Sequence, residues 1–63
     1  MEGLPKRWVR TDVDEAFDEA EERGDDIENS QYMYTECDTS HHHDYFKDVS
    51  TGAYTRSTYP CPY

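Results

Sequence analysis

The negative charge of this chain of 63 residues is concentrated in one short segment. Residues 12–28 hold ten of the fifteen acidic side chains and a single base, Arg23, so the segment carries a net charge of −9. The rest of the chain has five acids and five bases and is neutral overall. Because closely packed like charges repel one another, the segment has to keep its carboxylates in water. It can therefore turn only one side toward the rest of the protein.

An amphipathic helix meets this requirement, and the segment has the necessary spacing of apolar residues. Four of them follow at i, i+3, i+4 and i+7 and form one stripe: Val13, Ala16, Phe17 and Ala20. Thr11 or Asp12 precedes the stripe as an N-cap with an acid three residues later. Gly24 follows the stripe and suits the C′ position of a helix. We predict a helix from about residue 12 to residue 23.

The chain after the acidic segment alternates and is rich in Tyr and Thr, which is typical of β-strands. We predict strands at residues 31–37, 44–49 and 53–59, a possible short strand at 6–10 and a polar turn at 38–43. A helix of this length, with like charges four residues apart, is not stable alone. Its apolar stripe therefore packs on the sheet.

The predicted fold is α+β, a single small domain over residues 1–63 with one acidic amphipathic helix packed on a three- or four-stranded antiparallel sheet. The expected core consists of Trp8, Phe17, Ile27, Met33, Phe46 and Val49.

The composition excludes several classes of protein. No apolar run approaches the roughly 18–20 residues of a transmembrane helix, and residues 1–10 lack the apolar stretch of a secretory signal. We therefore expect a cytoplasmic location. The sequence has neither a Gly-rich phosphate loop nor a nucleophile elbow, and acid–base catalysis needs buried or coupled carboxylates. We expect no enzymatic activity and no cofactor.

Two rows of carboxylates are expected on the side of the helix away from the apolar stripe. Each row repeats about once per helical turn, roughly 5.4 Å, and together the rows imitate the charges of a sugar–phosphate backbone. A channel lined by Lys and Arg attracts such rows through the counterion release that drives nucleic-acid binding. The alternative is a solvated face that only keeps the protein soluble. The candidate partner-binding residues are Asp14, Asp18, Glu21 and Asp25 in one row and Glu15, Glu19, Glu22 and Asp26 in the other.

In its length, and in its combination of an acidic helix with a small sheet, the chain resembles phage-encoded inhibitors that mimic nucleic acid, including anti-CRISPR and anti-restriction proteins. The likeness covers the whole chain and uses no residue motif. It implies an inhibitor that binds a basic nucleic-acid-binding protein of the host, a CRISPR effector or a restriction enzyme, by electrostatic DNA mimicry. The cytoplasmic location would then be that of the host cell, if a phage encodes the protein. At a net charge of −9 we expect no direct contact with nucleic acid and none with a membrane. Lys6, Arg7 and Arg10 are instead expected to neutralise nearby acids.

A protein-interaction module is a second function compatible with the sequence. Tyr32 and Tyr34 are expected to share one face of a strand, and further tyrosines follow at positions 45, 54, 59 and 63. Because Tyr is enriched at protein interfaces, an exposed group of these rings suits a contact surface.

A small metal-binding domain is the third possibility. Cys37, Cys61 and the triplet His41–His43 are ligand types that zinc accepts, but the paired clusters of a structural zinc site are missing. We therefore assign no metal ligand. Without a secretory signal, we expect both cysteines to stay reduced.

Overall fold

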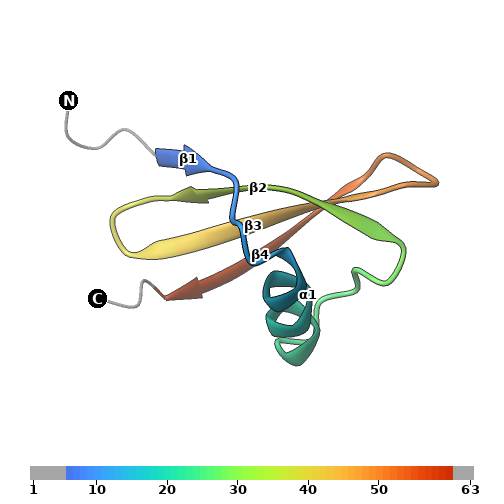
Figure 1. The fold of residues 1–63 in the computed structure, drawn as a ribbon, viewed down its shortest axis with the longest axis horizontal. Coiled ribbons are helices and arrows are strands. Elements are labelled where there is room, and N and C mark those ends of the chain that lie inside the picture. Colours follow the sequence, from blue (N-terminus) through green and yellow to red (C-terminus); the bar gives the residue numbers. More distant parts are fainter. Residues whose placement is uncertain (1–5, 61–63) are drawn as a thin grey trace.

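The computed structural model describes residues 6–60, which form one helix and four strands (Figure 1). In chain order these are β1 (Lys6–Trp8), α1 (Val13–Glu22), β2 (Ser30–Cys37), β3 (His41–Asp48) and β4 (Tyr54–Pro60). Each strand is antiparallel to its neighbours, and the order in the sheet is β1-β2-β3-β4. The helix packs against one face of the twisted sheet (Figure 1). The predicted α+β fold is confirmed, with four strands.

The C-terminal end of α1 has the geometry that its sequence predicts. Gly24 has a φ of +91°, in the left-handed region that glycine adopts readily. Its N–H donates to the carbonyl of Glu21, and the N–H of Asp25 donates to the carbonyl of Ala20, both at 3.0 Å. This pair of hydrogen bonds is the Schellman motif, which ends the helix and satisfies two of its last carbonyl groups.

The N-terminal end of α1 differs from the prediction. Asp12 occupies the N-cap position, but its side chain makes no capping hydrogen bond. Arg10 donates to the two carboxylate oxygens of Asp12 through Nε and Nη2, at 2.9 and 2.6 Å. The expectation of a side-chain cap from Thr11 or Asp12 is therefore wrong, because an arginine two residues upstream binds the carboxylate instead.

Strand β3 begins three residues earlier than predicted. The triplet His41–His43 belongs to the strand and not to a polar turn. The turn contains only residues 38–40, because Asp38 Oδ1 accepts hydrogen bonds from the backbone N–H groups of Ser40 and His41 at 2.9 and 2.8 Å. The Asp38 carboxylate thus satisfies two backbone N–H groups of the connection, which allows the turn to be short.

An irregularity at Met33 changes the face on which the side chains of β2 lie. Tyr32 pairs with Phe46 on β3, whereas Tyr34 pairs with Tyr45, so β2 contains one extra residue between them. Such a β-bulge shifts the alternation of side chains by one position. Tyr32 therefore lies on the helix side of the sheet and Tyr34 on the opposite side. The expectation that these two tyrosines share a face is wrong.

The core lies between α1 and the sheet and is small. Its fully buried members are at most 1 % exposed, and Phe17 packs against them. Of the expected core, Phe17, Ile27 and Phe46 are confirmed, and Met33 is half-buried. The fully buried apolar residues are Ala16, Ala20, Ile27 and Phe46.

Two expected core residues lie largely at the surface. Trp8 is 37 % exposed and Val49 is 60 % exposed. Trp8 belongs to a three-residue edge strand, and Val49 follows the end of β3 in the connection to β4, so neither position lies between the helix and the sheet. No helix among residues 6–60 has the length and apolar character needed to cross a membrane.

Candidate partner-binding surface

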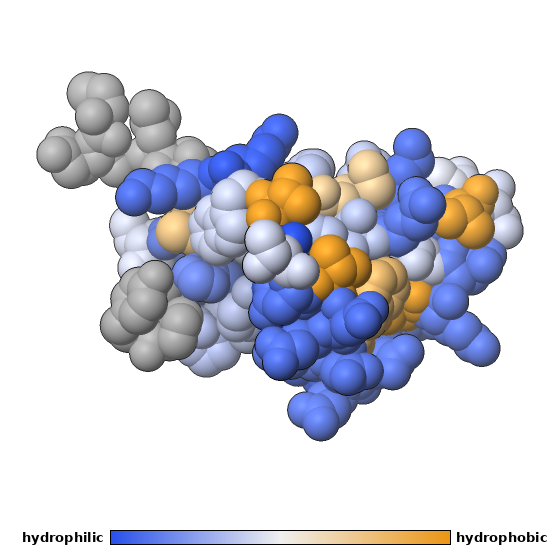
Figure 2. Space-filling view, in the orientation of Figure 1, coloured by the Kyte–Doolittle hydropathy of each residue, from blue (hydrophilic) through white to orange (hydrophobic). Residues whose placement is uncertain are grey.

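The candidate carboxylates lie along the solvent side of α1 and just beyond its end. Ala16 and Ala20 face the sheet, which turns the opposite side of the helix outward. Figure 2 shows hydrophilic side chains gathered over α1. Six of the eight candidates are exposed: Asp14, Glu15, Asp18, Glu21, Glu22 and Asp26.

The other two candidates have partners within the protein. Glu19 lies 3.3 Å from Nη1 of Arg10, and Asp25 accepts a hydrogen bond of 2.6 Å from the Ser57 hydroxyl. Asp25 and Asp26 also follow the last residue of α1, so they do not continue the helical rows as expected. The acidic surface of α1 is therefore defined by its exposed carboxylates, Asp14, Glu15, Asp18, Glu21 and Glu22.

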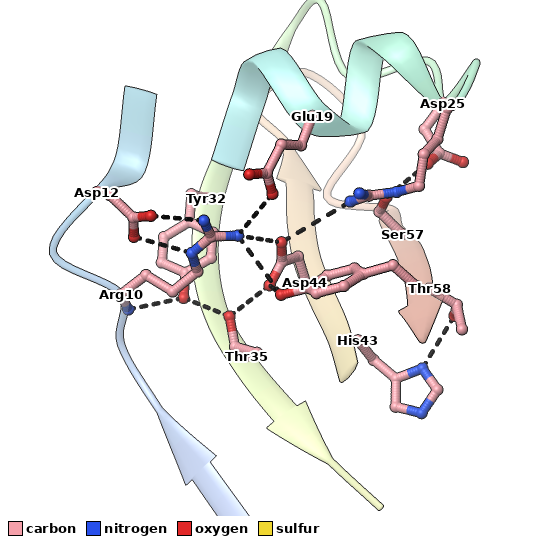
Figure 3. Close-up of polar contacts among 12 residues, drawn as sticks. Arg10, Asp12, Glu19, Asp25, Tyr32, Thr35, His43, Asp44, Ser57 and Thr58 are labelled. Atoms are coloured by element: carbon pink, nitrogen blue, oxygen red, sulfur yellow. Dashed lines mark hydrogen bonds and ion pairs between the residues drawn. The ribbon is translucent and has the colours of Figure 1, made fainter. Parts of the chain in front are cut away.

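A buried carboxylate, Asp44 on β3, joins α1 and the segment before it to the sheet (Figure 3). Its Oδ2 accepts a hydrogen bond of 2.9 Å from Nη1 of Arg10 and lies 3.9 Å from Nη2 of Arg23. Its Oδ1 accepts from the hydroxyls of Thr35 and Tyr59, at 2.5 and 3.3 Å. A charge removed from water needs such partners, and Asp44 has two cations and two hydroxyl donors.

Arg10 is also linked to Asp44 through the hydroxyl groups of Tyr32 and Thr35. Its backbone N–H donates to the hydroxyl of Tyr32 at 2.9 Å, and this hydroxyl lies 2.6 Å from Oγ1 of Thr35. Because Thr35 donates to Asp44, the hydroxyl of Tyr32 donates to Thr35. A directed chain of hydrogen bonds thus runs from the main chain at Arg10 to the buried carboxylate, while the guanidinium binds three acidic side chains (Figure 3).

Arg23 makes the corresponding contacts at the other end of α1. Its Nε donates to the Ser57 hydroxyl at 2.8 Å, and that hydroxyl donates to Asp25. The guanidinium carbon lies 4.4 Å from the centre of the Tyr59 ring. Arginines therefore fasten both ends of the acidic helix to the sheet. Within residues 6–60, no buried side-chain nitrogen or oxygen lacks a hydrogen-bond partner.

The network also fixes the charges of its members. Burial, together with the negative charge of Asp44, raises the pKa of Tyr59 to about 12. Hydrogen bonds from Arg10 lower the pKa of Asp12 to about 2, and the same interaction raises the pKa of Arg10. Tyr59 is therefore neutral, Asp12 negative and Arg10 positive at neutral pH.

We expect acid to destabilise the protein. Hydrogen bonds from arginines lower the pKa values of Asp12 and Glu36, and hydrogen bonds from backbone N–H groups lower those of Asp38 and Asp48. Such groups stabilise the folded state above their unfolded pKa of about 4, and this contribution is lost as the pH falls through the folded pKa. The urea midpoint should therefore decrease between about pH 5 and about pH 2, as measured by circular dichroism. Asp38→Asn should show a smaller decrease, and a midpoint that is constant or rises toward low pH would contradict the prediction.

The face of the sheet opposite α1 carries packed tyrosines and an arginine. The rings of Tyr34 and Tyr45 lie 5.0 Å apart between centres, and the guanidinium carbon of Arg7 lies 4.4 Å from the centre of the Tyr34 ring. Arg7 also pairs with Glu36 at 2.5 Å. The expectation that Lys6, Arg7 and Arg10 neutralise acids is confirmed by ion pairs of Arg7 and Arg10, whereas Lys6 forms no ion pair within residues 6–60.

The same face continues with two exposed cations and a third tyrosine. Arg56 pairs in register with Tyr45, and Tyr54 pairs with Lys47. In the described part of the chain neither Lys47 nor Arg56 forms an ion pair. The tyrosine–cation face is defined as Tyr34, Tyr45, Lys47, Tyr54 and Arg56.

The histidine triplet does not form a cluster of ligands. Side chains alternate along β3, so His42 is buried on the helix side between the rings of Trp8 and Tyr59, at 5.3 and 5.4 Å. His41 and His43 lie on the other face. Among residues 6–60, no group of three or more His, Cys, Asp or Glu side chains is placed to hold a metal ion.

Cys61, a possible metal ligand, and Tyr63, a possible interface residue, lie outside the described residues. Cys37 is half-buried on β2. The expectation that both cysteines are reduced stays a prediction.

The core predicted from the sequence does not include Asp44, which is buried. A signal for it exists, because Asp44 is two residues from the core ring Phe46 and so lies on the same face of β3. A carboxylate in phase with the core of a strand predicts a buried cationic partner. Arg10 and Arg23 supply that partner from both ends of the helix.

No family model matches the chain, and no curated protein and no solved structure matches it.

Proposed function

We propose that the protein is an inhibitor that presents the acidic surface of α1 to a basic nucleic-acid-binding protein of the host, such as a CRISPR effector or a restriction enzyme. The carboxylates would occupy Lys and Arg side chains that otherwise bind phosphates. The observation that supports this most directly is that none of the five exposed carboxylates forms an ion pair with another described residue. Solubility alone does not require them to gather on one side of one helix.

The anchoring of the helix supports the same proposal. Arg10 joins the segment before α1 to Asp44, and Arg23 joins the end of α1 to Ser57. A row of charges on a helix fixed at both ends loses little conformational entropy on binding, and such preorganisation strengthens an interface. The chain's own cations thus hold the helix in place, and the acids that they neutralise lie outside the acidic surface.

Charge reversal within the acidic surface tests the proposal. Asp18→Lys/Glu22→Lys should weaken binding about hundredfold or more, because loss of one partner of a hydrogen-bonded interfacial charge pair costs about 2–5 kcal/mol. The protein with an affinity tag is used to capture partners from host lysate, and the affinity of the purified partner is then measured by titration. The captured partner should bind DNA, and added DNA should displace the inhibitor.

A matched control separates position from net charge. Glu28→Lys changes the charge by the same amount as Asp18→Lys, but Glu28 is exposed beyond the end of α1. The Asp18 variant should lose affinity and the Glu28 variant should retain it. Equal effects of the two substitutions, or capture that survives high salt in the double variant, would show that the acidic surface of α1 is not the binding site.

A further inference from the structure

We infer that the tyrosine–cation face is a docking surface for the acidic surface of α1 on a second copy of the chain, so that copies associate head to tail. The inference adds the opposite face of the sheet to the acidic surface of α1 that the proposed function uses, and it requires no host protein. It rests on two cations of this face that form no ion pair within residues 6–60, on their spacing and on the tyrosine rings beside them.

Two cations stay unpaired on this face although acids are abundant. The chain has fifteen acidic and six basic side chains, yet Lys47 and Arg56 form no ion pair within residues 6–60. The register places them on adjacent strands as diagonal neighbours, since Arg56 is opposite Tyr45 and Lys47 is two residues further along β3. Like charges at this spacing repel each other. A negatively charged surface that covers them removes this repulsion.

The acidic surface of α1 has the matching spacing. Asp18 and Glu22 are four residues apart on the helix, which places their Cβ atoms about 5–6 Å apart. Diagonal neighbours across two antiparallel strands are about 7–8 Å apart between Cα atoms and somewhat closer between Cβ atoms. The side chains of Lys47 and Arg56 are long enough to take up the difference. Two ion pairs can therefore form at once without a change in either backbone.

The tyrosines give this face more than charge. Tyr45 lies opposite Arg56 and Tyr54 lies opposite Lys47, Tyr34 pairs with Tyr45 on the next strand, and Tyr54 is 52 % exposed. Tyr side chains offer a rigid ring to the methylene groups of Glu and a hydroxyl that donates to a carboxylate. The acidic surface of α1 and this face lie on opposite sides of the sheet, so the contact is heterologous, and a dimer keeps one free acidic surface on one copy and one free tyrosine–cation face on the other.

Sedimentation equilibrium of the purified chain tests the inference. At about 0.1 M salt the screening length is about 10 Å, which screens the repulsion between distant charges of two negative molecules while ion pairs in contact still attract, and at about 1 M it is roughly 3 Å, which weakens these ion pairs as well. The average mass should rise with protein concentration at the lower salt and stay that of a monomer at the higher salt. Asp18→Asn/Glu22→Gln and Lys47→Gln/Arg56→Gln should each weaken association about tenfold, the effect of two exposed ion pairs.

Mixing the two double variants gives the sharpest result. The first variant retains the tyrosine–cation face and the second retains the acidic surface, so an equimolar mixture should form dimers of wild-type strength that do not grow further. Lys6→Gln removes a cation that lies on the other face and should leave association unchanged. Self-association of the first variant alone at wild-type strength would show a symmetric face-to-face dimer and overturn the inference, as would a mixture that associates no more strongly than either variant alone.

A binding measurement with single-stranded nucleic acid tests a different ligand for the tyrosine–cation face. A short single-stranded oligonucleotide with a fluorescent label is added to the wild-type chain, since stacked bases and phosphates also suit tyrosines beside cations. We expect no change in its anisotropy at concentrations where the chain self-associates. Binding of the oligonucleotide that is lost in Lys47→Gln/Arg56→Gln would overturn the assignment to a second copy. If the chain does not self-associate but still binds the host protein, the inference is wrong and the proposed function is unaffected.

Discussion

Replacing Asp44 by alanine should leave the protein largely unfolded at room temperature. The substitution removes the acceptor for Arg10, Thr35 and Tyr59 and leaves two arginines without their buried carboxylate partner. Breaking a buried ion pair by removing one partner costs about 3–5 kcal/mol, and a domain of this size has only about 3–5 kcal/mol to lose. Loss of chemical-shift dispersion and of circular dichroism measures the outcome.

Removing the charged partners together should have a different result. Asp44→Leu combined with Arg10→Met and Arg23→Met replaces the buried charges by apolar groups, and such replacements are often neutral or stabilising. We expect this triple variant to fold. An Asp44→Ala variant with native stability would show that the buried network contributes little, and a triple variant that unfolds would show that the arginines are needed for other contacts.

Phe46→Ala should have an effect of similar size for a different reason. Phe46 is fully buried, and its ring lies 5.1 Å from that of Phe17 and 5.8 Å from that of Tyr32. Truncation of a buried Phe costs about 3–5 kcal/mol through lost burial and the cavity left behind. In a core with so few large apolar side chains no neighbour can fill the space. Urea unfolding at low temperature measures the change.

Val49→Ala provides the comparison for Phe46→Ala. Val49 is 60 % exposed, so its truncation should change the free energy of unfolding by less than about 0.5 kcal/mol. The sequence predicts both residues in the core, and only Phe46 is found there. Equal losses of stability in the two variants would contradict the core described above.

The helix and the class of fold could be predicted because their signals are local. The apolar stripe and Gly24 define α1, and period-two alternation rich in Tyr and Thr defines the strands, without reference to distant residues. The start of β3 could not be predicted, because three histidines in a row have the polarity of a loop. Only the hydrogen bonds of Asp38 show how short the turn is.

The identity of the partners of Asp44 and the faces of β2 could not be predicted, because both depend on contacts between distant parts of the chain. The ion pair between Arg10 and Asp44 joins residues separated by 34 positions. In the sequence Asp44 is one acid among fifteen. The bulge at Met33 has no marker such as glycine, so the alternation of β2 gives Tyr32 and Tyr34 the same face. The sequence predicts the acidic surface of the helix, but it does not predict the ion pair between Arg10 and Glu19.

The bulge has a consequence for the whole polar centre. Tyr32 and Thr35 are three residues apart, and in an uninterrupted strand their side chains would point away from each other on opposite sides of the sheet. The extra residue between them allows their hydroxyls to meet at 2.6 Å. The bulge in β2 is thus required for the chain of hydrogen bonds that ends at Asp44. The irregular point of β2 thereby helps to satisfy the buried carboxylate of Asp44.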